Sequence, residues 1–293
     1  LIRKVIFNGK KATGVEVENN NEIKIYEAPE IILSAGAIAS PQILLLSGVG
    51  PQEHLEEMGI PVVHSLPGVG KNLRDHPAVF LTWNTKGEDP EIPPVGFQFS
   101  CRYTAEGSDL RNDMMIIMCS IGIGHVRTSG YSDSPPGLTM IAHLYLALSQ
   151  GELHLQSTDP AVQPFLDHNM LDHEFDRLRI REQLRICLEL AKKPEMSKFL
   201  GELRSPTWDD LSSDEKMDDW MMKEVTTGHH ISGTCKMGPY DDGMAVVNQY
   251  GRVHGLQGIR VADASIMPDC IRANTNVPTM MIGERMSDLI KQN

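Results

Sequence analysis

An apolar strand, a glycine turn and a helix follow one another near the start of the chain, and this order limits the fold more than any other feature. Ile31-Ile32-Leu33 is continuously apolar, as is typical of a strand that is buried on both faces. Ala35-Gly36-Ala37 forms the turn, and Ser40 and Pro41 suit the N-cap and the first turn of a helix. The succession is typical of a nucleotide-binding α/β sheet.

Short β-like runs precede this segment and are separated by asparagine- and glycine-rich turns: Leu1–Phe7, Thr13–Glu18 and Glu22–Glu27. Near the other end, Gly258–Ala262 is a predicted strand. A predicted helix begins near Val277, because apolar residues then recur at helical spacing. We expect this last helix to pack back onto the first unit, which both ends of the chain therefore build.

The middle of the chain has a different pattern. Alternating or β-rich runs come first: Val79–Thr85, Met114–Ile121, Leu138–Leu148 and Glu152–Gln156. Two predicted helices follow at Asp172–Ala191 and Ser213–Val225. This pattern predicts an antiparallel sheet with helices to one side, an α+β unit inserted into the α/β unit. The expected boundaries are 1–76 for the first part of the α/β unit, 77–227 for the inserted unit and 228–293 for the last part of the α/β unit.

Composition excludes several classes of protein. The formal net charge of −12 argues against nucleic acid or an anionic membrane surface as the partner. Five scattered cysteines with no CxxC pair favour a reducing compartment, so we expect a cytoplasmic protein without a zinc site. No apolar stretch is long enough to predict a transmembrane segment.

Two adjacent histidines, His229 and His230, lie in a glycine-flanked segment that is neither a clean helix nor a clean strand. Histidine is the side chain best suited to exchange protons near neutral pH. No zinc-ligand spacing surrounds the pair, and the chain has no GxSxG elbow of a serine hydrolase. From these residues alone, a structural role for the pair is the more frequent outcome.

A second candidate segment follows the predicted strand at Gly258–Ala262. Asp263 stands at the end of that strand, where an acidic residue commonly accepts a hydroxyl of a cofactor's sugar chain. Asn276 is a suitable N-cap for the last helix, with Pro278 in its first turn. The start of that helix would present backbone N–H groups to a developing negative charge. A simple capped helix after a turn explains the same residues.

Four motifs, in order, resemble those of the glucose–methanol–choline oxidoreductases. Residues 36–50, from Gly36-Ala37-Ile38 to Gly48-Val49-Gly50, resemble the family's second signature, and Gly68–Pro77 resembles the segment that follows it. His230 with Gly233-Thr234 matches the HxxGT element, and Asn276-Val277-Pro278 matches the second active-site element. The resemblance implies a partial Rossmann-like FAD-binding domain and an antiparallel-sheet substrate domain.

The resemblance also implies roles. A histidine at the position of His230 takes or relays the hydroxyl proton of an alcohol, while hydride passes to the flavin N5. Asn276 would be the second catalytic residue, in the asparagine version that is similar to choline dehydrogenases. His229 stands at a position where relatives often carry another residue, so it would either line the substrate pocket or pack. Residues expected near FAD are Ala35 and Gly36 on the adenosine side, Asp263 and Ala264 near the ribityl and diphosphate part, and Val277 at the pyrimidine. His76, in the second motif, is a weaker candidate.

The sequence departs from the family in one respect, because the GxGxxG loop that cradles the FAD diphosphate is not found in it. The chain also begins at Leu1 within strand-like sequence, so we expect an N-terminal portion outside it and weak or absent FAD binding by this fragment alone. The expected partners are a small alcohol and an electron acceptor, either a quinone, a carrier or oxygen, with a dehydrogenase favoured. A lyase or photodecarboxylase of the same fold, or a non-catalytic remnant, remains as an alternative.

Overall fold

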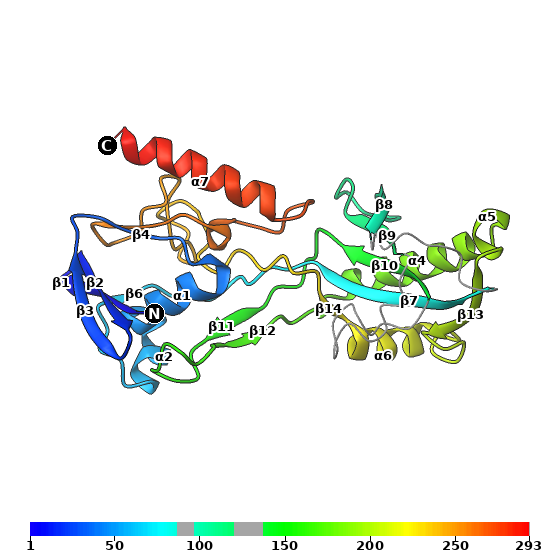
Figure 1. Ribbon diagram of the computed structural model, residues 1–293, viewed down its shortest axis with the longest axis horizontal. Coiled ribbons are helices and arrows are strands. Elements are labelled where there is room, and N and C mark those ends of the chain that lie inside the picture. The colour runs from blue at the N-terminus through cyan, green and yellow to red at the C-terminus, as the bar shows by residue number, and fades with distance from the viewer. Residues whose placement is uncertain (87–96, 120–136, 293) are drawn as a thin grey trace. The chain divides into compact units, whose positions relative to one another are not determined.

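The computed structural model describes residues 1–86, 97–119 and 137–292 (Figure 1). The chain forms two compact units. Unit 1 contains Leu1–Asp75, Gln150–Asn169 and His230–Asn293, and unit 2 contains His76–Ser149 and Met170–His229. The sequence boundaries at 76 and 227 lie close to these limits, but the sequence placed residues 150–169 in the insert. They cluster with unit 1 because Gly151 and Leu73 exchange two backbone hydrogen bonds of 2.9 Å.

Unit 1 begins with a three-stranded antiparallel sheet of β1 (Ile2–Asn8), β2 (Lys11–Asn19) and β3 (Glu22–Glu27). The three predicted β runs are therefore confirmed. The turn between β2 and β3 uses Asn20 and Asn21, both at positive φ, where asparagine is better tolerated than most residues.

Strand β4 (Ile31–Leu33) pairs in parallel with β15 (Ile259–Val261), so segments from the two ends of the chain form one sheet. The prediction that β4 is buried on both faces is wrong, because Ile32 is 44% exposed while Ile31 and Leu33 are buried. Among the described residues β4 has β15 as its strand partner and alternates between an inner and an outer face.

Helix α1 (Gly36–Leu46) has its N-cap at Ala35, five residues earlier than the sequence predicted, and Pro41 lies inside it. Ser40 is therefore not the N-cap. Its hydroxyl instead accepts a hydrogen bond from the backbone N–H of Ala35 and donates one to the carboxylate of Asp263, 223 residues away in the sequence. A long-range partner of this kind leaves no local signal.

The remaining elements of unit 1 are short except for the last helix. They are β5 (Val49–Gly50), α2 (Gln52–Glu57), β6 (His64–Ser65), β11 (Glu152–His154), β12 (Phe165–Asp167), the 3₁₀ turn η3 (Ala264–Ile266) and α7 (Asn276–Lys291). β5 and β6 pair in parallel, and β11 and β12 pair antiparallel. Met286 and Leu289 of α7 lie in the same core cluster as Leu33 and Leu44, which confirms that the final helix packs onto the first part of the chain.

Unit 2 contains an antiparallel sheet in the order β13-β7-β10-β9-β8, with β14 also paired to β7. The strands are β7 (Pro77–Thr85), β8 (Phe97–Tyr103), β9 (Met114–Cys119), β10 (Leu138–Leu144), β13 (Leu200–Ser205) and β14 (Thr226–Thr227). The antiparallel sheet of the insert is thereby confirmed. The sequence did not predict β8, and the end of the predicted run Met114–Ile121 lies outside the described residues.

Unit 2 also contains the helices α4 (Glu174–Ala191), α5 (Pro194–Ser197) and α6 (Asp214–Glu224), and the long helix α4 runs along the sheet (Figure 1). Leu184 of α4 and Trp220 of α6 share one core cluster with side chains from a single face of the sheet, such as Leu81 and Met140. The two predicted helices are thus confirmed within two residues at each end.

In the part of the chain that the structure describes, no helix has both the length and the apolar character needed to cross a bilayer.

Candidate active site

Asp263 connects the end of β15 to the beginning of α1. Its Oδ2 accepts hydrogen bonds from Gly36 N at 3.0 Å and from Ser40 Oγ at 2.5 Å, and its Oδ1 accepts one from Ser265 N at 2.8 Å. The side chain is only 3% exposed. Gly36 has a φ of +87°, which an L-residue rarely adopts, so glycine suits this turn. The carboxylate therefore fixes the turn, while Ala35 beside it stays exposed.

Thr234, the last residue of the HxxGT element, ties that element to α1. Its buried hydroxyl donates a hydrogen bond of 2.6 Å to the carbonyl oxygen of Ala37. In a regular helix this carbonyl would accept from the amide four residues later, which is Pro41 and has no N–H. The threonine thus supplies a donor that the helix itself lacks.

Gly233 lies close to the backbone of the second motif. Its φ is +82°, and a Cβ at this position would stand 2.6 Å from the carbonyl oxygen of Asn72. Asn72 Nδ2 in turn donates to the carbonyl of Gly233 at 3.1 Å, and Gly233 N donates to the carbonyl of Ala264 at 3.1 Å. The glycine of HxxGT is required by close backbone approach, and the buried Ala264 contributes its carbonyl to the same junction.

The backbone of His230 is held by a buried carboxylate. His230 N donates to Asp75 Oδ1 at 3.0 Å, and Asp75 Oδ2 lies 3.4 Å from His168 Nδ1. The Asp75 side chain is 1% exposed. Next to this contact, Arg74 and Ser232 exchange two backbone hydrogen bonds of 2.9 Å. The loop that carries His230 is therefore held at the histidine's own amide and again two residues later at Ser232.

The imidazole of His230 is half-buried, and its Nε2 lies 3.1 Å from Nδ2 of Asn274. Asn274 precedes α7 by two residues and was not among the residues predicted from the sequence. Asn276, which the family motif indicated, is exposed and begins α7. The pair of asparagines in Ala273-Asn274-Thr275-Asn276 was the available signal, but the motif matched only the second of them.

The first turn of α7 presents backbone donors. Thr275, not Asn276 as predicted, occupies the N-cap position, and within the described residues no side chain caps this helix start. Val277 is 68% exposed, and Met280 and Met281 on the next turn are also exposed. Uncapped N–H groups at the positive end of a 16-residue helix suit an anionic or electron-rich ligand.

Cys235 follows the HxxGT element but is chemically quiet. It is fully buried, and this burial, together with the negative charge of Asp263, raises the pKa of its thiol. A thiol in this state is a poor nucleophile. The chemistry of the segment therefore rests on the histidine.

The two other candidate histidines, His229 and His76, lie in unit 2. His229 is exposed, has a φ of +63° and donates its backbone N–H to Thr227 Oγ1 at 2.8 Å. His76 is 1% exposed and stacks on the ring of Tyr145, with the ring centroids 4.2 Å apart. A stacked, buried ring of this kind fits a packing role, whereas the exposed ring of His229 is accessible to a ligand.

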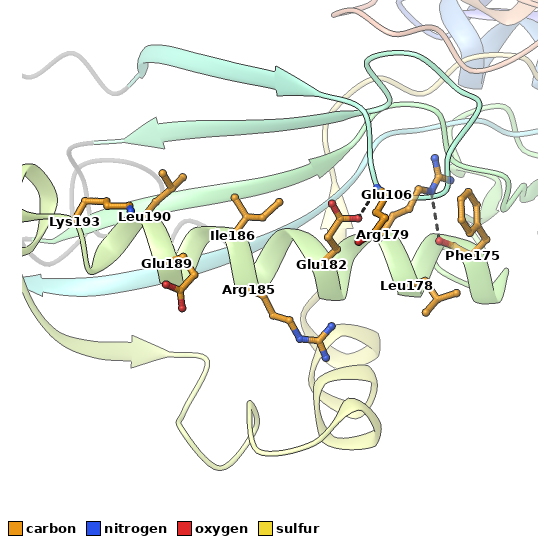
Figure 2. A pocket seen from close by; sticks show the side chains of 10 residues that line it. All are labelled: Glu106, Phe175, Leu178, Arg179, Glu182, Arg185, Ile186, Glu189, Leu190 and Lys193. Carbon is orange, nitrogen blue, oxygen red and sulfur yellow. Dashed lines mark hydrogen bonds between the residues drawn. The ribbon is translucent and has the colours of Figure 1, made fainter.

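A surface groove of about 580 Å³ runs along α4 in unit 2. Figure 2 shows its lining side chains, which include Phe175, Leu178, Ile186 and Leu190 with charged residues between them. None of the predicted site residues lines it. Among the described residues there is also no group of three or more His, Cys, Asp or Glu side chains that could hold a metal ion.

Comparison with known proteins relates this site to one family. Two models described as GMC oxidoreductase match the chain, the N-terminal one over residues 1–78 and the C-terminal one over residues 147–283. An oxygen-dependent choline dehydrogenase of Chromohalobacter salexigens is 37% identical over 97% of this chain and 55% of its own length. One from Klebsiella pneumoniae is 37% identical over 98% of this chain and 56% of its own length.

Solved structures share the fold. Pyridoxine 4-oxidase from Mesorbium loti superposes with a TM-score of 0.90 over 100% of this chain and 57% of that protein, at 23% identity. A formate oxidase superposes with a TM-score of 0.88 over 99% of this chain and 59% of that protein, at 24% identity. The expected fold class is confirmed. The chain spans about half the length of the curated relatives that it matches.

Proposed function

The chain belongs to the GMC oxidoreductase family, whose members are FAD-dependent flavoproteins, and we propose that it carries the catalytic face of an alcohol-oxidising enzyme. The observation that carries the proposal is the position of His230. Its amide is held by the buried Asp75, and its half-buried ring stands beside Asn274 at the approach to α7. The reaction is the conversion of a CH–OH group to an aldehyde or ketone.

His230 takes the hydroxyl proton of the alcohol and later returns it to solvent. A neutral imidazole has one unprotonated ring nitrogen, and histidine exchanges protons near pH 7 more readily than any other unperturbed side chain. When bound, FAD supplies the hydride acceptor at its N5, which receives the hydrogen of the carbinol carbon with its electron pair. Loss of one proton and one hydride from the alcohol leaves the carbonyl product, so atoms and electrons balance.

Asn276 orients the substrate oxygen. Its exposed carboxamide can donate and accept hydrogen bonds but cannot titrate, so proton transfer stays with His230. Exposed His229 is proposed to line the substrate pocket. The assignment of Asn276 follows the family motif, and the exposure of both side chains supports the two assignments.

The residues present fit a flavin on the side where this chain would meet it. The uncapped N–H groups at Asn276 and Val277 could donate to the pyrimidine part of a bound flavin, and the dipole of α7 would favour negative charge there. Ala35 is exposed, and Gly36 has no side chain and no atom within 4 Å of the place where a Cβ would stand. This turn would therefore permit close approach of the adenosine side of FAD. Buried Asp263 and Ala264 would act by shaping this turn and the neighbouring HxxGT loop.

The 293 residues contain no GxGxxG loop, the motif that holds the FAD diphosphate. We therefore propose that residues 1–293 alone hold FAD weakly and do not turn over. The activity, the substrate and the partners of the whole protein are proposals as well.

The substrate is proposed to be a small alcohol, with choline the first to test because the matched relatives are named choline dehydrogenases. Electrons then pass to a quinone, a carrier or oxygen, with dehydrogenase activity favoured over oxidase activity. None of the described cysteines forms a disulfide, which supports a reducing compartment such as the cytoplasm.

The test uses the complete open reading frame that encodes residues 1–293, purified with FAD and mixed anaerobically with a panel of alcohols that includes choline. Bleaching of the flavin absorbance by one alcohol class, with an artificial acceptor restoring the colour, is the expected result. No bleaching by any alcohol, together with cyanide release from a cyanohydrin or light-dependent CO2 release from a fatty acid, would overturn it.

A further inference from the structure

Asn274 is the side chain that meets the ring of His230, and the family motifs in this sequence give it no role. Its Nδ2 lies 3.1 Å from Nε2 of the imidazole, across 44 residues of sequence. It is exposed and belongs to the segment that leads into α7. Nothing in the local sequence requires an asparagine for the helix itself, since Thr275 occupies the N-cap position.

The chemistry of this contact determines where the ring carries its proton. A carboxamide nitrogen has two N–H donors and no lone pair that accepts, so Nε2 of His230 must be the acceptor. A neutral imidazole carries a single ring proton, which is then on Nδ1. With the carboxamide turned the other way, its oxygen would require the proton on Nε2 instead. The two orientations therefore predict opposite tautomers.

The backbone contact and the ring contact together restrict His230. Asp75 Oδ1 holds the amide at 3.0 Å, which leaves rotation about the two side-chain torsions as the main freedom of the imidazole. The hydrogen bond from Asn274 removes much of that rotation. Asp75 is a charged group in direct contact with the histidine backbone, and its other oxygen lies 3.4 Å from His168 Nδ1.

We propose that Asn274 is a positioning residue that holds the His230 ring in the Nδ1–H tautomer with its Nε2 lone pair facing the α7 approach. The inference rests on the proposed function, in which that lone pair accepts the hydroxyl proton. The amide nitrogen stands at hydrogen-bond distance from Nε2, where a hydroxyl donor would also stand. A substrate hydroxyl therefore replaces the amide as the donor to a ring that is already turned and protonated correctly.

The decisive measurement is the tautomer of His230, read by long-range ¹H–¹⁵N correlation spectra of ¹⁵N-histidine-labelled protein at a pH where the ring is neutral. The complete reading frame is used, and His230→Gln identifies the signal. We expect the Nδ1–H form in the wild type, a mixture of both tautomers in Asn274→Ala, and partial return to Nδ1–H in Asn274→Gln. The matched control is Asn19→Ala, an exposed asparagine at the end of β2, which should leave the His230 signal unchanged.

Two results would overturn the inference: an Nε2–H tautomer in the wild type, or an unchanged tautomer in Asn274→Ala. Unchanged signals of the other histidines show that the variant is folded. Kinetics add a second reading, because Asn274→Ala should lower kcat by about threefold to tenfold with KM little changed, the effect of losing one orienting hydrogen bond.

Failure of this inference and failure of the proposed function are distinguishable. The tautomer does not depend on turnover, so a wild type with the Nδ1–H form that oxidises no alcohol refutes the function and leaves the positioning contact intact. A wild type that oxidises alcohols with the Nε2–H form refutes the role of Asn274 alone.

Discussion

The hydroxyl of Thr234 donates to the carbonyl of Ala37 at 2.6 Å, and this is the helical carbonyl that Pro41 leaves without its usual amide donor. Thr234 is fully buried, so water does not replace the bond. The threonine of the HxxGT element thus completes a helix in the second-signature segment. Through this contact the loop that carries His230 is fixed to the turn at Gly36.

Thr234→Val should lower the free energy of unfolding by about 1–3 kcal/mol, because the isosteric change leaves a buried carbonyl without a donor. Pro41→Ala restores the amide that this carbonyl lacks. The valine substitution should therefore cost less in the Pro41→Ala background, which urea unfolding of the four proteins measures. Thr158→Val, at an exposed threonine, is the control and should be nearly neutral. Equal costs in both backgrounds would disprove the shared-carbonyl explanation.

Gly233→Ala should destabilise the protein by about 2 kcal/mol or more, because it combines a positive φ with a Cβ 2.6 Å from a backbone oxygen. Gly9→Ala is the matched comparison, since Gly9 has a φ of +56° but no atom within 4 Å of its Cβ position. It should cost about 1 kcal/mol. The difference between the two unfolding free energies isolates the close approach to Asn72, and equal values would argue against it.

His230→Ala in the flavin-loaded protein should lower turnover on the order of 10²–10⁴-fold, the usual effect of removing a general base. The flavin absorbance should be retained, because the motif residues proposed for the flavin are elsewhere. Anaerobic rapid mixing with the best alcohol measures the rate of flavin reduction. His173→Ala, at the N-cap of α4 in unit 2, controls for loss of a histidine and should keep the rate. An unchanged rate in His230→Ala would refute its role.

Stability should fall as the pH falls below about 6.5, the ordinary histidine pKa. Burial first, and then the charge of His154, lowers the pKa of His54, whose Nε2 accepts from Leu155 N at 3.0 Å. The unfolded chain therefore binds a proton before the folded one does, so stability is complete above pH 6.5 and is lost down to the folded-state pKa. Burial likewise lowers the pKa of His64, which adds to the same slope.

His54→Gln tests this assignment. The glutamine side chain offers an acceptor oxygen but does not titrate, so the slope of unfolding free energy against pH between 7 and 5 should become shallower. Part of the slope should remain because of His64. A slope identical to that of the wild type would assign the pH dependence to other groups.

Residues 1–293 mixed with FAD should not retain stoichiometric flavin through gel filtration, because the GxGxxG loop is not among them. The protein encoded by the complete reading frame is treated in the same way and serves as the comparison, if it extends beyond these residues. A flavin spectrum that survives gel filtration at one FAD per chain would show that the motifs described above suffice for binding.

The elements with strong local patterns could be predicted from the sequence, whereas β8 and several short elements could not. Three β-like runs with asparagine turns predicted β1 to β3, and apolar residues along the helix predicted α4 and α7. The helix α6 was predicted as an acidic segment. The family resemblance by itself indicated His230 and Asn276 as candidate site residues. Periodicity and turn chemistry are properties of neighbouring residues, so a linear sequence displays them.

Tertiary structure decided what depends on distant partners. The start of α1 at Gly36 follows from Asp263, and the donor for Ala37 comes from Thr234, each about 200 residues away. The outward face of Ile32 and the contact of Asn274 with His230 likewise depend on which segments lie side by side. Hydrogen bonds across such separations leave no periodic signal, so only the folded chain shows which asparagine reaches the histidine.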